Sequence, residues 1–146
     1  MLPNSQNMSH TDLVERAIRW LKNSQRCRLV MSESYSWYVG ETPDVIGWYG
    51  HAVSILIECK TSRADFCRDR RKYFRRMPHR GLGVYRYYMT PKDLLSPDEL
   101  PYKWGLLEIR GKIVRKVKEA KAFDFYRAAY MENPLLISAA LYRKAI

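Results

Sequence analysis

Residues 43–60 contain two carboxylates and one ammonium group at a spacing that could form an active site. The segment reads PDVIGWYGHAVSILIECK, so Asp44 precedes one apolar run, and Glu58 and Lys60 close a second one. Side chains alternate along a β-strand, so Glu58 and Lys60 project to one face and Cys59 projects to the other. Charges at the end of an apolar strand are costly unless they are paired, which favours a functional reason for them.

The turn between the two runs decides how Asp44 lies relative to Glu58. The runs 44–48 and 52–58 predict a β-hairpin. With a three-residue loop or a bulge, Asp44 lies opposite Glu58, whereas a two-residue loop places it opposite Ile57. In either register the carboxylates are about 5 Å apart, as cross-strand neighbours are, and they would repel each other without a cation.

A divalent ion is the simplest partner for two such carboxylates. Carboxylate oxygens suit Mg²⁺ or Mn²⁺, and the backbone carbonyl of Cys59 could add a ligand. An ion with few protein ligands keeps open positions for a phosphate oxygen and an attacking water. Lys60 would orient that water or neutralise charge on the phosphorus. The pattern therefore predicts hydrolysis of phosphodiester bonds, with Asp44, Glu58 and Lys60 as the reacting set.

The charge of the chain predicts a polyanionic partner. Its 146 residues carry 26 Lys and Arg against 15 Asp and Glu, a formal charge of +11 and a pI near 9.7. Nine basic residues fall between positions 60 and 80, and phosphate contacts from such a segment would give sequence-independent affinity for DNA. We expect DNA contacts from Arg63, Arg68, Arg70, Arg71, Lys72, Arg75 and Arg76.

The elements that would position these residues form an α/β (α+β) pattern. A helix is predicted over 11–23, capped by Thr11 or Asp12, followed by a strand over 28–39 and the hairpin. A basic helix over 61–77, capped by Thr61 or Ser62, then leads to a strand over 84–89. The order αβββαβ predicts a mixed central sheet flanked by helices.

The last third of the chain adds a second hairpin and a helix. The runs 104–109 and 112–117 predict two strands around Gly111, and residues 123–143 predict a helix interrupted near Asn133-Pro134. With 47% hydrophobic residues the chain can bury one core, so we expect a single domain over 1–146, with its core at about 11–90. The sequence shows neither a membrane-spanning run nor a signal peptide, and its three cysteines predict free thiols, which favours a cytoplasmic protein without a membrane partner.

The chain resembles the PD-(D/E)XK nuclease superfamily over residues 12–89. Pro43-Asp44 and Glu58-Cys59-Lys60 match its signature, and residues 57–60 (IECK) are similar to the matching strand of archaeal-type Holliday-junction resolvases. Residues 61–73 are similar to the segment after that strand in MmcB-like DNA-repair nucleases. The resemblance implies a restriction-endonuclease-like core and a Mg²⁺-dependent nuclease of DNA repair, recombination or phage DNA metabolism. It also implies that two copies can pair, as resolvases do.

The superfamily usually supplies one further acid, for which the sequence offers two candidates. Glu15 lies on the first predicted helix and is slightly favoured, whereas Glu33 lies on the first predicted strand and fits the MmcB-like pattern. A second copy of the Glu-x-Lys pattern, Glu119-Ala-Lys121, stands in a polar stretch that ends no buried strand. The alternative to an enzyme is a catalytically inactive nucleic-acid-binding or interaction protein on the same fold.

Overall fold

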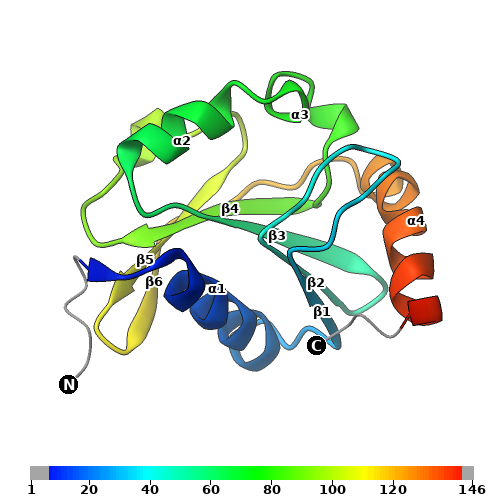
Figure 1. Cartoon of the computed structure of the whole chain (residues 1–146), viewed down its shortest axis with the longest axis horizontal. Helices are drawn as coiled ribbons and strands as arrows, with labels where there is room; N and C mark the ends of the chain where they lie inside the picture. The colour runs from blue at the N-terminus through cyan, green and yellow to red at the C-terminus, as the bar shows by residue number, and fades with distance from the viewer. Residues whose placement is uncertain (1–6, 143–146) are drawn as a thin grey trace.

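A mixed six-stranded sheet with helices on both faces forms the protein (Figure 1). The structure is a computed structural model that describes residues 7–142. The strands follow one another in chain order across the sheet. They are β1 (Leu29–Ser32), β2 (Val45–Tyr49), β3 (Val53–Cys59), β4 (Tyr85–Pro91), β5 (Gly105–Arg110) and β6 (Ile113–Lys118). β3, β4 and β5 run parallel, and the other neighbouring pairs are antiparallel.

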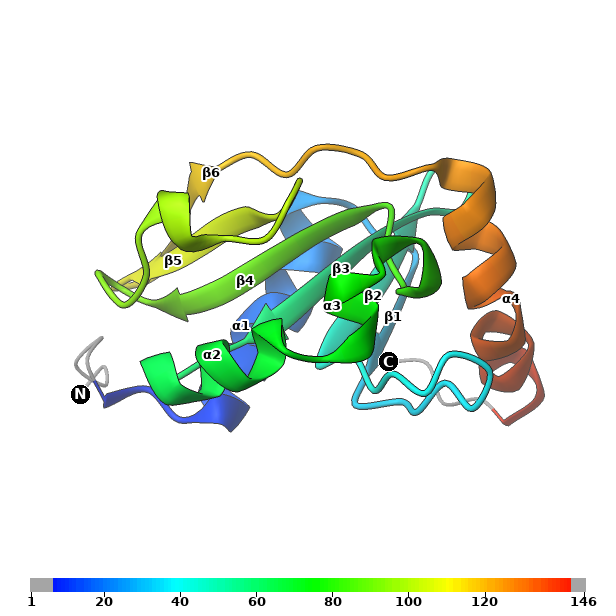
Figure 2. The same cartoon turned by 90° about the horizontal axis from the view of Figure 1, so that it is seen from above.

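The helices divide the core into two layers. α1 (His10–Arg19) covers one face, where its residues Leu13 and Ala17 pack with Ile57 and Cys59 of β3. α2 (Arg63–Arg70), α3 (Tyr73–Arg76) and α4 (Phe125–Tyr142) lie on the other face, as the view from above shows (Figure 2). The order α1, three strands, α2 and α3, then β4, followed by a hairpin and a helix, is the predicted one.

α1 begins earlier than the sequence suggests. Ser9, and not Thr11 or Asp12, is the N-cap: its hydroxyl accepts from Asp12 N at 3.1 Å, and the Asp12 carboxylate accepts from Ser9 N at 2.9 Å. This reciprocal pair satisfies two backbone donors that a helix start leaves open. The helix continues as the π-helical turn η2 (Trp20–Ser24), close to the predicted end.

The first strand is shorter than predicted. β1 ends at Ser32, and the predicted remainder, 33–39, leaves the sheet. Glu33 adopts a positive φ of 52°, a conformation that ends an extended strand. An isolated bridge between Ser36 and Glu41 then closes the loop, and Glu41 is buried inside the protein. Its buried partners, described below, explain why the loop turns inward.

The basic helix is broken into two pieces. Ser62 caps α2 as predicted, with its hydroxyl accepting from Asp65 N at 3.2 Å. Lys72 is extended (φ −61°, ψ 145°) and starts α3, which the short 3₁₀ helix η3 (Pro78–Arg80) follows. The break rotates the residues after it, so Arg75 points into the core although a continuous helix would place it elsewhere.

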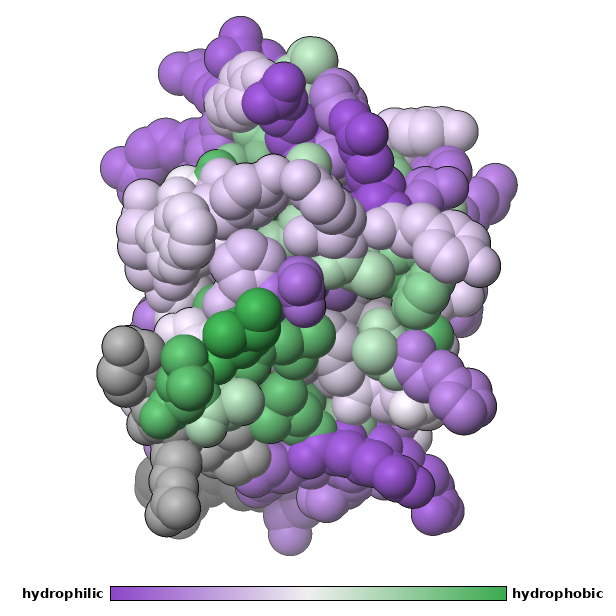
Figure 3. Space-filling model, turned by 90° about the vertical axis from the view of Figure 1, so that its right-hand side faces the viewer, coloured by the Kyte–Doolittle hydropathy of each residue, from purple (hydrophilic) through white to green (hydrophobic). Residues whose placement is uncertain are grey.

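α4 runs without interruption through Pro134, which corrects the predicted break at Asn133-Pro134. The helix is held to the sheet by Glu132, whose buried carboxylate accepts from Trp48 Nε1, Ser54 Oγ and Gly83 N at 3.2, 2.6 and 2.8 Å. Figure 3 shows the outer side of this region, where hydrophobic residues gather in a green patch; Ile137 and Leu141 are the exposed aliphatic residues of α4. The predicted last residue of the helix, Arg143, lies outside the described residues.

The β5–β6 hairpin around Gly111 is confirmed. All three cysteines are free thiols, as expected. Among residues 7–142 no helix is both long enough and apolar enough to cross a bilayer.

Candidate active site

The β2–β3 hairpin places Asp44 opposite Glu58. Tyr49 pairs with Val53 across a three-residue loop, and the register continues to Val45 opposite Ile57. One residue beyond this pair, Asp44 lies opposite Glu58. This is the register predicted for a three-residue loop. The Asp44 carboxylate is fixed there, because its Oδ2 accepts from the backbone N–H of Cys59 at 2.7 Å.

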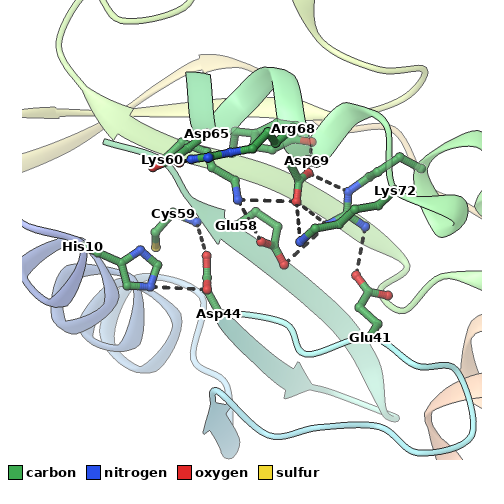
Figure 4. A network of polar contacts seen from close by, with 12 residues as sticks. His10, Glu41, Asp44, Glu58, Cys59, Lys60, Asp65, Arg68, Asp69 and Lys72 are labelled. Atoms are coloured by element: carbon green, nitrogen blue, oxygen red, sulfur yellow. Dashed lines mark hydrogen bonds and ion pairs between the residues drawn. The ribbon is translucent and has the colours of Figure 1, made fainter. Parts of the chain in front are cut away.

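Lys60 lies on the same face as Glu58, as strand alternation predicts. Its Nζ is 3.6 Å from Glu58 Oε2 and 3.4 Å from Asp69 Oδ1 (Figure 4). The side chain of Cys59 is buried on the opposite face under α1, so only its backbone is available to the site. Asp44, Glu58 and Lys60 therefore meet where β2 begins and β3 ends.

Arg75, which the sequence analysis predicted to contact DNA, is instead buried beside this group. The Arg75 side chain is only 1% exposed. Its Nε is 2.8 Å from Asp69 Oδ2, its Nη1 is 2.9 Å from Glu41 Oε1, and its Nη2 is 3.4 Å from Glu58 Oε1. A guanidinium enclosed by three carboxylates cannot also bind phosphate at the surface. Arg75 therefore does not belong to the exposed basic surface.

Asp69 is one of the residues of the site that sequence reasoning missed. It is fully buried on α2 and accepts hydrogen bonds from Arg75 and from the Tyr88 hydroxyl. A signal was present, since Asp69 follows Phe66 by three residues and so lies on the buried face of the helix. Glu41 gave no comparable signal, because its partners are distant in sequence.

Burial dominates the electrostatics of the acids. Burial, with smaller contributions from the charges of Asp44 and Asp69, raises the pKa of Glu58 to about 8, although Arg75 and Lys60 oppose the shift. Burial would also raise the pKa of Asp69, but Arg75, Lys60 and the Tyr88 hydrogen bond outweigh it and lower the pKa. Burial disfavours the charged form of Lys60, yet Glu58 and Asp69 raise its pKa, so it remains an ammonium group.

The raised pKa of Glu58 predicts a loss of stability at alkaline pH in metal-free protein. A carboxyl with a pKa near 8 when folded and about 4.3 when unfolded stabilises the fold below the lower value. That contribution is lost as the pH rises through about 8. Urea midpoints measured in EDTA from acid to alkaline pH should fall for the wild type and fall less for Glu58→Gln. Parallel curves for the two proteins would contradict the assignment.

The two candidates for the further acid differ in position. Glu33 lies at the rim of the site, where its Oε1 is 3.7 Å from His10 Nε2, and the same nitrogen is 3.4 Å from Asp44 Oδ1. Glu15 lies on the exposed side of α1, and its carboxylate forms no ion pair or hydrogen bond with the described residues. The structure thus brings Glu33 rather than the slightly favoured Glu15 to Asp44. It also brings in His10, the first residue of α1, which lies just before the predicted helix over 11–23.

The remaining basic residues form an exposed surface next to the site. Three of them are engaged with acids: Arg63 pairs with Glu99, and Lys72 Nζ is 3.0 Å from Asp69 Oδ1. Arg68 also pairs with its helix neighbour Asp65. The side chains of Arg70, Arg71 and Arg76 are exposed on α2, α3 and their junction. We call the exposed group Arg68, Arg70, Arg71, Lys72 and Arg76 the basic surface.

The donor atoms of the site are compatible with a hard divalent ion. Glu58 Oε1 is buried and accepts no hydrogen bond, and Asp44 Oδ1 has only the imidazole of His10 beside it. Both are carboxylate oxygens, the ligands that Mg²⁺ prefers. Among residues 7–142 no three His, Cys, Asp or Glu side chains are gathered in a ready metal site. Asp44 and Glu58 would therefore be the two side-chain ligands.

Comparison with known proteins identifies a shared fold. No protein-family model matches the chain, and no curated protein matches it. Among solved structures, SPO1766, a protein of unknown function from Silicibacter pomeroyi, superposes with a TM-score of 0.67 at 18% identity. The match covers 94% of this chain and 91% of that one. At this identity the likeness shows the fold alone.

Proposed function

We propose that this protein is a metal-dependent nuclease that hydrolyses phosphodiester bonds of DNA. One observation carries the proposal: Asp44, Glu58 and Lys60, which match the PD-(D/E)XK signature, converge at one point where β2 begins and β3 ends. The basic surface begins on the helix that follows β3 directly, so a bound DNA backbone would lie next to these groups. A role in DNA repair, recombination or phage DNA metabolism follows from the resemblance, and the free thiols support a cytoplasmic location.

Each residue of the chain has a distinct task in this proposal. Asp44 and Glu58 would hold Mg²⁺ or Mn²⁺, which when bound supplies charge neutralisation at the phosphate and a more acidic water. The N–H of Cys59 keeps the Asp44 carboxylate in place. Lys60 donates to the attacking water or to a phosphate oxygen, because its side chain lies at the edge of the cluster and is 11% exposed. Asp69 and Arg75 position Lys60 and Glu58 from the buried side.

The experiment that tests the function is a cleavage assay with several DNA forms. Purified protein is incubated with plasmid, single-stranded and branched DNA in Mg²⁺, in Mn²⁺ and in EDTA. We expect cleavage in both metals and none in EDTA. DNA that stays intact under all metal conditions, while the protein still binds it, would contradict the nuclease proposal.

A non-catalytic DNA-binding protein is the second candidate, and one observation favours it. Glu58 is already approached by Lys60 and Arg75 on its two oxygens, so the acids of the site are balanced by the side chains of the protein itself. Such a site would be a stable structural cluster beneath a basic surface. The same assay separates the two candidates, because this protein would bind DNA with or without metal and cleave none of it.

The basic surface predicts how DNA affinity depends on salt. The double charge reversal Arg70→Glu with Arg71→Glu should weaken binding and lower the slope of log affinity against log salt by about 2, since each lost phosphate contact removes about 0.9. Fluorescence anisotropy across a salt series measures both quantities. The control is Lys22→Glu, an exposed residue of η2 on the opposite face of the sheet. If Lys22→Glu weakens binding as much, the DNA does not bind at the basic surface.

A further inference from the structure

A cavity separate from the candidate active site opens between η3 and the start of α4. Its volume is about 290 Å³, and the residues that matter for its chemistry are Gly81, Arg86, Tyr102, Phe123 and Arg127. Small-molecule sites usually measure about 300 to 1,000 Å³, so this cavity suits a single ring system rather than a large ligand.

The cavity wall carries a buried hydrogen-bond donor without a partner. Arg86 is 2% exposed, and its Nε and Nη2 donate to Gly83 O and Pro78 O at 2.8 and 2.9 Å. Its Nη1 is buried and bonds to none of the described residues. The space beside this nitrogen is open because residue 81 is glycine: a Cβ added there would lie 2.9 Å from Nη1. A buried donor is normally satisfied, so a ligand acceptor placed here would complete it.

The rest of the lining is aromatic and planar. The Arg86 guanidinium lies over the Phe123 ring, with Cζ 4.0 Å from the ring centroid. Tyr102 meets Phe123 edge-on at 6.5 Å and is itself 75% exposed, with Lys103 Nζ 5.3 Å from its ring centroid, so an incoming group would stack on the face away from Lys103. Arg127 adds an exposed positive charge at the same cavity. A flat heterocycle with hydrogen-bond acceptors, attached to a phosphate backbone, fits this combination.

The cavity lies along the same sheet face as the candidate active site. Arg86 pairs with Leu56 and Tyr88 pairs with Glu58 in the β3–β4 register, so Arg86 and Tyr88 project to the face on which Glu58 lies. Exposed Arg76 and Arg80 on α3 and η3 connect the basic surface to the cavity. A DNA backbone that follows these residues from Lys60 would arrive at the cavity.

We propose that this cavity binds one unpaired nucleobase of the DNA substrate. The base stacks on Tyr102 and its acceptor edge receives the free N–H of Arg86. Every base carries an acceptor, so the cavity selects an unpaired base over a paired one rather than one sequence over another. This inference deepens the proposed function and rests on it for the identity of the ligand.

The test compares three labelled duplexes in EDTA, where no cleavage occurs: one fully paired, one with a single bulged thymidine, and one with a bulged abasic nucleotide. By fluorescence anisotropy the wild type should bind the thymidine bulge about tenfold more tightly than the other two. Tyr102→Ala and Gly81→Ala should bind all three alike. Gly81 has an ordinary extended backbone (φ −91°), so alanine there obstructs Nη1 without backbone strain. The matched control is Tyr126→Ala, an 81% exposed tyrosine of α4 that does not line the cavity.

Three results would overturn the proposal: equal binding of all duplexes by the wild type, equal binding of the thymidine and abasic bulges, or loss of the preference in Tyr126→Ala. If Gly81→Ala fails to fold, Tyr102→Ala decides alone, because its side chain is exposed. Cleavage of the paired duplex in Mg²⁺ is measured in parallel. A preference for the thymidine bulge without cleavage would support the base-binding cavity and reject the nuclease. Cleavage without such a preference would support the nuclease and reject the base-binding cavity.

Discussion

Lys60→Met is expected to lower DNA cleavage at least about 100-fold while DNA binding survives. Among residues 7–142, the Lys60 ammonium group is the one positive charge that reaches Glu58 and remains partly exposed, whereas Arg75 is enclosed. Asp44→Asn should have an effect of similar size, because it removes one of the two proposed carboxylate ligands of the metal and leaves the Cys59 N–H an amide oxygen to bond. Initial rates of plasmid nicking in Mg²⁺ measure both effects.

The second Glu-x-Lys pattern supplies the control for this prediction. Lys121 is exposed and follows Glu119 by the same spacing, but it lies after β6 and away from any buried strand end. Lys121→Met therefore removes the same charge from the same short motif without touching the site. Equal cleavage by Lys60→Met and Lys121→Met would reject the mechanism, provided that anisotropy shows unchanged DNA binding.

Arg75→Met is expected to lower the free energy of unfolding by about 3 to 5 kcal/mol. The substitution keeps an unbranched apolar side chain but removes the guanidinium, which lies over the Trp104 ring and carries the charge that three buried carboxylates share. Removing one partner of a buried ion pair costs more than the pair contributes, because the remaining charges stay desolvated. Urea denaturation followed by tryptophan fluorescence gives the value.

The neighbouring residue provides the comparison. Arg76 is exposed, so Arg76→Met should change stability by no more than about 0.5 kcal/mol. The two variants lose the same charge from the same short helix, but only Arg75→Met removes the contacts to the buried acids. If both variants unfold at the same urea concentration, Arg75 is not the residue that holds Glu41, Glu58 and Asp69 together.

The central part of the site followed from local rules. Strand alternation placed Glu58 and Lys60 on one face, and hairpin geometry limited Asp44 to two registers, one of which the structure shows. These relations depend on residues that are close in sequence or on adjacent strands, where spacing determines geometry. The order of helices and strands along the chain, and the mixed sheet flanked by helices, followed for the same reason.

The supporting residues did not follow, because they depend on contacts between distant segments. Glu41 reaches Arg75 across 34 positions, and no local pattern marks a loop glutamate as buried. The prediction that Arg75 binds DNA treated residues 61–77 as one continuous helix, but the extended conformation of Lys72 turns the chain and directs Arg75 inward. The predicted helix over 11–23 did not include His10, because the N-cap is Ser9 rather than Thr11 or Asp12.

The hydrogen bonds of Glu132 have a consequence for how the chain is made. Ser54 on β3 and the amide of Gly83 before β4 share one acceptor, and that acceptor belongs to α4, which is synthesised after both strands. In a nascent chain that does not yet include α4, these two donors bond to water instead. This part of the interior therefore closes only after α4 has left the ribosome.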